Sequence, residues 1–327
     1  MVRLRAISVI GNMKKYPNTK QPMKKQISLI TIGSLASGLP SQAALLFYES
    51  FDYTAGTTIG GQTPALGAGG AWADTSGGGG PMTVRANGSS VAQTWAGIPG
   101  TSAFPNAGGF LEGERRNENE GSILLATSVT NQFTNGSTIW LSYVAAATTL
   151  DGSPDNHSKP SVAIGAGALL DDRAQAAAGQ AIGAGAVFNN SSGPISATIW
   201  EDNNGSPATF EHNRGTPSIN RITPQQLVIA RIDFGAVTDT VTSTVFDLDP
   251  FTSLTEADFN SATLSTITST ANLDQSTFNT LSFHGSRTNL DEIRIATSFG
   301  EAVGIPEPSA GLLTLLGLAG VSLRRRR

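Results

Sequence analysis

The chain has 327 residues, with no cysteine, 37 glycines and only 14% charged residues. The absence of cysteine excludes disulfides and thiolate-bound zinc or iron-sulfur centres. A composition rich in glycine and poor in charge favours short strands joined by turns, and the length suits one large all-β domain with short terminal segments.

The N-terminal part has the pattern of a secretory signal. A positive segment, Met23-Lys24-Lys25, precedes an apolar run from Ile27 to Leu39 that is too short to span a bilayer stably. Ser41-Gln42-Ala43 then places small residues where a signal peptidase cleaves. We therefore predict a signal helix and cleavage after Ala43 by signal peptidase.

The body alternates short runs of β-branched or aromatic residues with clusters of Gly, Asn, Asp and Pro. Within one run, Ile232 and Phe234 share a face while Arg231 and Asp233 share the other. This pattern predicts an all-β fold, a two-sheet antiparallel sandwich. The clearest expected strands are Leu45–Tyr48, Thr138–Val144, Ser161–Ile164, Ile195–Trp200, Leu227–Phe234, Thr240–Leu248, Thr280–His284 and Leu290–Ile295.

Two stretches are expected to be loops. The segment Gly165 to Val187 is rich in Ala and Gly, and we expect it to cross the sandwich as a loop, although Ala174 to Ala178 has the composition of a helical turn. The run Arg116 to Glu120 has the composition of a solvated loop. Helix content should be low.

The C-terminal end combines a short motif, an apolar run and a basic cluster. Pro306, Glu307 and Pro308 precede the apolar run Ala310 to Leu323. Four arginines end the chain: Arg324, Arg325, Arg326 and Arg327. This order resembles the PEP-CTERM sorting signal over about the last 23 residues.

The resemblance implies recognition of the Pro-Glu-Pro motif by an exosortase, a transpeptidase-like membrane protease. It also implies a short transmembrane helix inserted transiently in the inner membrane of a Gram-negative bacterium, with the arginines as a stop-transfer cluster. The tail is then lost, and the protein reaches the cell surface or the extracellular matrix. A plain C-terminal anchor is the alternative interpretation.

The expected organisation therefore has four parts. Residues 1–22, which contain a second Met at position 13, are interpreted as an overcalled gene start, with an extended n-region as the alternative. The signal peptide covers 23–43, the β-sandwich 44–304 and the sorting signal 305–327. Between the two signals, residues 44–305 carry 10 basic against 24 acidic residues, a net charge of −14. So acidic a surface repels phosphate backbones and anionic lipid, which argues against nucleic acid as a partner.

The body also resembles concanavalin-like, laminin-G-like jelly rolls. The resemblance rests on the opening Glu49-Ser50-Phe51-Asp52-Tyr53, on Trp72 and on the closing Leu290 to Ile295, and it spans roughly residues 45 to 300. It implies that the first and last strands pair. Proteins of that fold include lectins, carbohydrate-binding modules and polysaccharide hydrolases, so function must be argued from residues.

Catalysis has weak support in the sequence. Hydrolases that resemble this fold carry an acidic triplet on one strand, which points two carboxylates to one face. The nearest match, Glu112-Gly113-Glu114, lacks the central Asp and the register. His284 ends a predicted strand, and we interpret it as structural. We therefore expect a non-catalytic protein.

Binding sites have two kinds of candidates. Oxygen-rich loops at Asp151 with Asp155, and at Asp202, are candidate calcium sites, although Asp and Asn are equally good turn formers; no other cofactor is indicated. Trp95 and Trp72 are candidates for stacking on a sugar ring, whereas Trp140 is expected in the core.

Taken with the sorting signals, these features predict a non-catalytic surface or matrix protein that contacts extracellular polysaccharide, for adhesion or in a biofilm. A divergent polysaccharide-active enzyme is the alternative.

Overall fold

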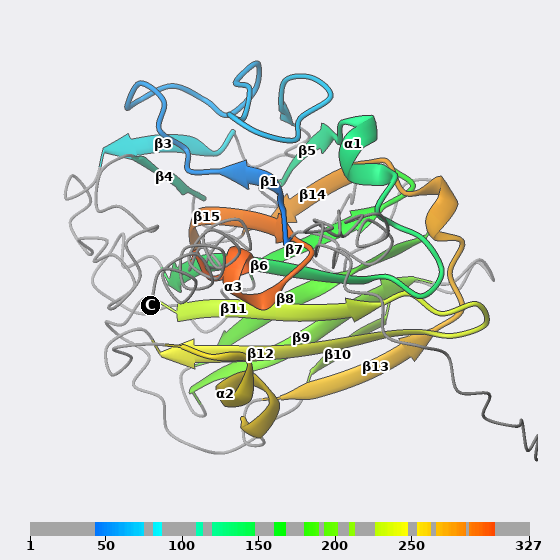
Figure 1. Ribbon diagram of the computed structural model, residues 1–327. Helices are drawn as coiled ribbons and strands as arrows, with labels where there is room; N and C mark the ends of the chain where they lie inside the picture. The colour runs from blue at the N-terminus through cyan, green and yellow to red at the C-terminus, as the bar shows by residue number, and fades with distance from the viewer. Residues whose placement is uncertain are drawn as a thin grey trace, which may run out of the picture. The chain divides into compact units, whose positions relative to one another are not determined.

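The computed structural model describes twelve segments of the chain: residues 43–74, 81–86, 109–113, 120–147, 160–167, 180–189, 193–201, 209–212, 226–247, 254–262, 266–285 and 288–304. These segments belong to one compact unit that begins at Ala43. Within them the chain forms fifteen strands, three short α-helices and one 3-10 turn (Figure 1). None of the helices in these segments has the length and apolar character needed to cross a membrane.

The strands form two antiparallel sheets. The eight-stranded sheet has the order β13 (Ile267–Ala271), β12 (Asp239–Asp247), β11 (Gln226–Asp233), β6 (Thr138–Ala147), β15 (Thr288–Ala296), β4 (Gly109–Glu112) and β3 (Thr83–Ala86), and β1 (Leu45–Glu49) also pairs with β15. The seven-stranded sheet has the order β10 (Thr209–His212), β9 (Gly193–Glu201), β8 (Ala181–Asn189), β7 (Ser161–Gly165), β14 (Thr280–His284), β5 (Glu120–Leu124) and β2 (Ala73–Asp74). The helical elements are α1 (Thr127–Thr130), α2 (Glu256–Ser261), η1 (Gln275–Thr277) and α3 (Phe299–Ala302).

The expected two-sheet antiparallel sandwich is confirmed. Each of the eight expected strands is present, with ends within three residues of the prediction. The expected pairing of the first and last strands is also confirmed, since β1 pairs with β15 in the register Phe47↔Ile295 and Glu49↔Ile293. The pairing holds because Phe47, Ile293 and Ile295 all lie fully buried on the inner face.

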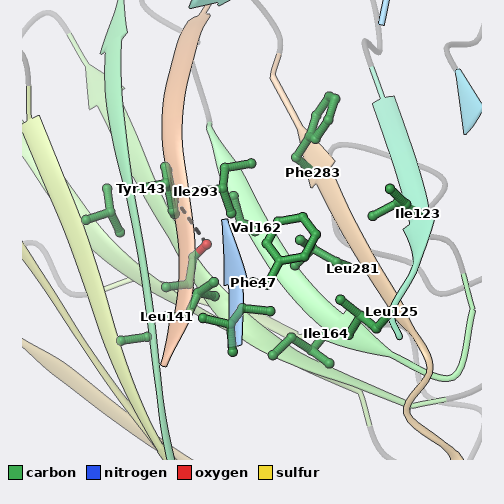
Figure 2. Packing of buried hydrophobic residues seen from close by; sticks show 14 of the residues in the cluster. Phe47, Ile123, Leu125, Leu141, Tyr143, Val162, Ile164, Leu281, Phe283 and Ile293 are labelled. Carbon is green, nitrogen blue, oxygen red and sulfur yellow. Dashed lines mark hydrogen bonds between the residues drawn. The ribbon is translucent and has the colours of Figure 1, made fainter. Parts of the chain in front are cut away.

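The main core lies between the two sheets (Figure 2). Leu141 and Tyr143 of β6 and Ile293 of β15 face Val162 of β7 and Leu281 of β14 in this cluster. The buried Tyr143 hydroxyl is 3.1 Å from the Pro160 carbonyl oxygen and 3.2 Å from that of Ala184, so its polar atom has acceptors in the apolar interior. Strands β6, β7, β11 and β14 contribute alternate residues to this core, as the period of a strand requires.

A second buried cluster covers the outer face of the eight-stranded sheet. There, Leu227 and Ile229 of β11 pack in one cluster with Phe259 of α2 and Phe299 of α3. Further along β11, Ile232 is buried on the inner face while Arg231 on the outer face is only half-buried, which confirms the alternation expected for this strand. The outer face is therefore apolar beneath the helices and polar beyond them.

Two loop predictions are wrong in part. The segment Gly165 to Val187 was expected to be a loop, but Ala181–Asn189 forms strand β8 between β7 and β9. Its small residues are explained by close packing, because a Cβ on Gly183 would lie 2.2 Å from the Val162 carbonyl oxygen. Glu120, expected in a solvated loop, begins strand β5 and is buried.

Candidate functional site

A pocket of about 370 Å³ opens on the outer face of the eight-stranded sheet, beside α2 and α3. Two adjacent strands and the two helices contribute its lining, which consists of Thr138, Trp140, Arg231, Glu256, Thr297, Ser298, Phe299 and Gly300. The volume lies in the range of sites that bind small molecules, and the lining combines aromatic rings with a few polar groups, as such sites do.

Trp140 lines the pocket and anchors both helices. Its ring makes edge-to-face contacts with Phe259 of α2, at 5.0 Å between centroids, and with Phe299 of α3, at 5.2 Å. Such contacts stabilise aromatic pairs beyond the area they bury. Trp140 is 3% exposed, which confirms its expected place in a core. It therefore shapes the pocket and offers no open ring face.

The guanidinium of Arg231 is the positive charge of the pocket. It lies 5.9 Å from the centre of the Trp140 ring, and its Nε–H donates to Asp233 at 3.0 Å. The Thr138 hydroxyl donates to the same carboxylate at 2.6 Å. A guanidinium has five N–H donors, and this contact uses one of them.

Helix capping holds the other side of the pocket in place. Thr255 and Asp258 form a capping box at the start of α2, which positions Glu256 in the first turn. Ser298 caps α3 by accepting from the Glu301 N–H, and the Ser142 hydroxyl of β6 donates to the Ala302 carbonyl at 2.6 Å. This side of the pocket is therefore attached to the sheet. It is lined by Thr297, Ser298 and Glu256.

Apart from Trp140, no residue of the pocket lining was predicted from the sequence as part of a site. The alternation of its strand predicts only that Arg231 lies on a polar face, and no sequence pattern marks Glu256 or Ser298. The local sequence contains no motif that joins them, since they come from β11, α2 and the N-cap of α3. One sequence signal could have indicated a polar surface on two strands: the Thr-x-Thr-x-Thr spacing occurs at 240–244 and again at 266–270.

Trp72 requires a correction. It was a candidate for sugar stacking, but it is 2% exposed, and its ring packs against Phe283 at 5.0 Å and against Phe47 at 6.4 Å. Its indole N–H donates to the Glu49 carboxylate at 2.7 Å. Both residues belong to the sequence fragments that resemble jelly rolls. Trp72 is a core residue because both its ring and its N–H find partners inside the sandwich.

Glu49 is held by three donors. Besides Trp72, the Phe51 N–H and the Tyr53 hydroxyl donate to its carboxylate, each at 2.6 Å. Burial raises the pKa of Glu49, and these hydrogen bonds partly oppose that shift. The arrangement fixes the backbone after β1, where Phe51 adopts a φ of +48°. Glu49 is therefore structural.

Glu112, the sequence candidate for catalysis, is also held by a protein partner, and Glu114 lies outside the described residues. Glu112 is 3% exposed and accepts from Arg85 Nε at 2.5 Å. Glu120 and His284 face each other across β5 and β14 with 3.6 Å between Oε1 and Nδ1, and each is 1% exposed. Glu112 and Glu120 belong to different sheets, so they do not share a strand face.

Several expected sites lie outside the described residues and stay predictions. They are Trp95, the calcium candidates Asp151, Asp155 and Asp202, the sorting motif Pro306, Glu307 and Pro308, and the arginines Arg324, Arg325, Arg326 and Arg327. Within the described part of the chain, no group of three or more His, Asp or Glu side chains has a geometry that could hold a metal ion.

Comparison with known proteins gives matches among solved structures alone. No family model and no curated protein matches the chain. One similar structure is the CBM2 module of the evolved Dit protein of Lactobacillus casei BL23 phage J-1, with 10% identity, a TM-score of 0.38, and coverage of 78% of this chain and 96% of that one.

Two further similar structures are an alginate lyase and a lectin-like protein. A mutant of the alginate lyase Aly36B, in complex with alginate tetrasaccharide, has 10% identity and a TM-score of 0.36 over 77% of this chain and 97% of that one. Arcelin-5, a lectin-like defence protein from Phaseolus vulgaris, has 7% identity and a TM-score of 0.34 over 77% and 99%.

Proposed function

We propose that this chain is a non-catalytic exported protein of the cell surface or extracellular matrix, and that its sandwich contacts extracellular polysaccharide. The observation that carries the proposal is the pocket on the outer face of the eight-stranded sheet. Its Arg231, Glu256 and Ser298 present charged groups and a hydroxyl in a space of about 370 Å³. Sugar hydroxyls both donate and accept, so they match such a mixed lining.

The electrostatics support an uncharged glycan. Arg231 is already paired with Asp233, so Glu256 leaves the pocket and its rim with a net negative charge. The exported region as a whole carries a net charge of −14. Both features disfavour polymers rich in uronate or phosphate and leave neutral sugars as the best match.

The engagement of the buried carboxylates supports a role without catalysis. Glu112 is paired with Arg85, and neither Glu112 nor Glu120 lines the pocket. The divergent polysaccharide-active enzyme remains the alternative. Release of reducing ends from a polysaccharide, abolished by Glu112→Gln, would overturn the non-catalytic proposal.

Export belongs to the same proposal and rests on the terminal signals. Signal peptidase would release the N-terminal segment, and an exosortase would process the tail after Pro306, Glu307 and Pro308 are recognised. Calcium at Asp151, Asp155 or Asp202 and sugar stacking on Trp95 stay proposals for loops outside the described residues.

A glycan array tests the pocket. We expect the full chain to bind neutral glycans and Arg231→Lys to weaken binding about tenfold or more, because lysine keeps the charge but loses the planar fork of donors. The matched control is Arg85→Lys. Arg85 is also a half-exposed arginine paired with a carboxylate on the same sheet, but it lies outside the pocket lining.

Glu256→Gln provides a second arm, since it removes the free carboxylate but keeps the shape of the side chain. We expect it to reduce binding while the melting temperature stays close to that of the parent. If Arg85→Lys weakened binding as much as Arg231→Lys, the pocket would not be the site. If no neutral glycan bound, the proposed function would fall.

A further inference from the structure

A threonine ladder extends across the outer face of the eight-stranded sheet. Thr240 and Thr242 of β12 face Thr270 and Thr268 of β13, in the register Thr240↔Thr270 and Thr242↔Thr268. The two residues on β12 are half-buried and the two on β13 are exposed. The next pair, Thr244 with Thr266, continues the spacing, but Thr244 is fully buried, so the accessible part of the ladder ends there.

The ladder is continuous with the pocket. Strand pairing places Thr268, Thr242, Arg231 and Trp140 in one row across β13, β12, β11 and β6. A neighbouring row contains Thr270, Thr240, Asp233 and Thr138. Arg231, Trp140 and Thr138 line the pocket, so both rows begin there and lead outward to β13 at the edge of the sheet.

The hydroxyls of the ladder can serve a polar ligand. Thr242 Oγ1 and Thr268 Oγ1 lie 3.0 Å apart and share one hydrogen bond, so one O–H and several lone pairs of this pair remain for a partner. Each threonine also carries a methyl group. A face that offers both hydroxyl and methyl groups matches a sugar ring, which has polar edges and apolar C–H surfaces.

The length of the row from β6 to β13 matches a chain of sugars better than a single sugar. Neighbouring strands are about 4.8 Å apart, so three steps from β6 to β13 span about 14 Å, which exceeds one sugar ring. The exported region has a net charge of −14, which disfavours anionic polymers along the whole row.

We propose that the threonine ladder is an extended subsite for an uncharged, linear polysaccharide, which runs from the pocket across β11 and β12 to β13. This inference rests on the proposed function, because the pocket holds one end of the chain. It assigns Thr242 and Thr268 to contacts with sugars outside the pocket, and it implies that the protein binds the ends of chains in preference to free monosaccharides.

The test measures affinity as a function of ligand length. Linear neutral gluco-, xylo- and manno-oligosaccharides of one to six residues are titrated calorimetrically into the full chain and into the double variant Thr242→Val/Thr268→Val. Valine keeps the β-branched shape and strand propensity while removing the hydroxyls. We expect the parent affinity to rise by tenfold or more from one to four residues, and the double variant to lose most of that rise while keeping its affinity for the shortest ligand.

The matched control is Thr83→Val, which removes a half-buried threonine hydroxyl from β3, near the opposite edge of the same sheet. It should behave as the parent does. Affinity that does not depend on length, or a double variant equal to the parent for long ligands, would overturn the ladder while leaving the pocket in place. Absence of binding to any of these neutral ligands, at every length, would overturn the proposed function together with this inference.

Discussion

At the scale of single residues, buried carboxylates connect β1 with β15, the first and last strands of the domain. β15 has a bulge at Asp291 to Arg294, where Glu292 adopts a φ of +54°, and the Asp291 carboxylate accepts from the Glu292 N–H at 2.8 Å. Tyr48 of β1 donates to Glu292, and the Arg294 guanidinium lies 4.5 Å from the centre of the Tyr48 ring. Burial raises the pKa of Asp291, and the nearby carboxylates of Glu292 and Glu49 add to that shift.

A pH titration of stability tests this cluster. Because the pKa of Asp291 is higher in the folded than in the unfolded state, its stabilising contribution is present below the ordinary carboxyl pKa of about 4 and is lost as the pH rises through the folded pKa. Asp291→Asn keeps the oxygen that accepts from Glu292 but cannot ionise. We expect it to be more stable at pH 7, by on the order of 1 kcal/mol, and to show a flatter pH dependence in urea unfolding.

Asp258→Asn is a control, because the pKa shift of Asp258 has the opposite sign to that of Asp291. Asp258 is exposed, and the hydrogen bonds from Thr255 lower the pKa of its carboxyl. Its contribution is therefore present above the ordinary carboxyl pKa and lost as the pH falls, so this variant should lose stability at neutral pH. Parallel pH profiles for the two variants would contradict the assignment.

Close contact between neighbouring strands explains the small residues of β8 at the element scale. A Cβ on Gly183 would lie 2.2 Å from the Val162 carbonyl oxygen and 2.5 Å from the Ala163 Cα, and backbone atoms of this kind cannot move aside without shifting β7. The strand is central in its sheet, between β7 and β9. The small residues of β8, which suggested a loop, are thus explained by its close packing against β7.

Substitution at Gly183 measures this constraint. We expect Gly183→Ala to lower the free energy of unfolding by about 1–3 kcal/mol, the usual cost of overpacking, as measured by the urea midpoint. The control is Gly70→Ala, because a Cβ there has no atom within 4 Å and the residue lacks a positive φ. It should be neutral or slightly stabilising. Equal effects of the two changes would show that β8 does not require glycine.

Two buried layers define the domain at the scale of the whole molecule. One lies between the sheets, and the other lies under α2 and α3 on the outer face of the eight-stranded sheet (Figure 1). The second layer ends at Arg231 and Asp233, which are half-buried. The polar pocket therefore opens where the helical cover stops, and the threonine ladder occupies the part of the face beyond it.

The proposed export has a consequence for the covalent ends of the mature protein. Intact-mass and terminal-peptide spectrometry of protein from the native extracellular fraction should show a start at Ala44 and an end near Pro306, since both signals are removed. Protein found in the membrane with Arg324 to Arg327 retained would show a simple anchor and end the exosortase proposal. The first result would make the mature protein the form for glycan screening.

Local sequence was sufficient for the positions of the long strands and for the alternation at Ile232 and Arg231, because side-chain direction in a strand depends on neighbours two residues apart. The jelly-roll resemblance also predicted the pairing of β1 with β15. Local sequence failed for Gly183 and Glu120, where packing overrides composition.

The binding face depends on long-range register. Thr268, Thr242, Arg231 and Trp140 come from four strands, and they form one row because backbone hydrogen bonding aligns those strands residue by residue. A shift of one residue in any pairing would turn that strand's polar side chains to the inner face. Burial of the apolar side chains in two layers specifies this register, and it is a property of the assembled sandwich.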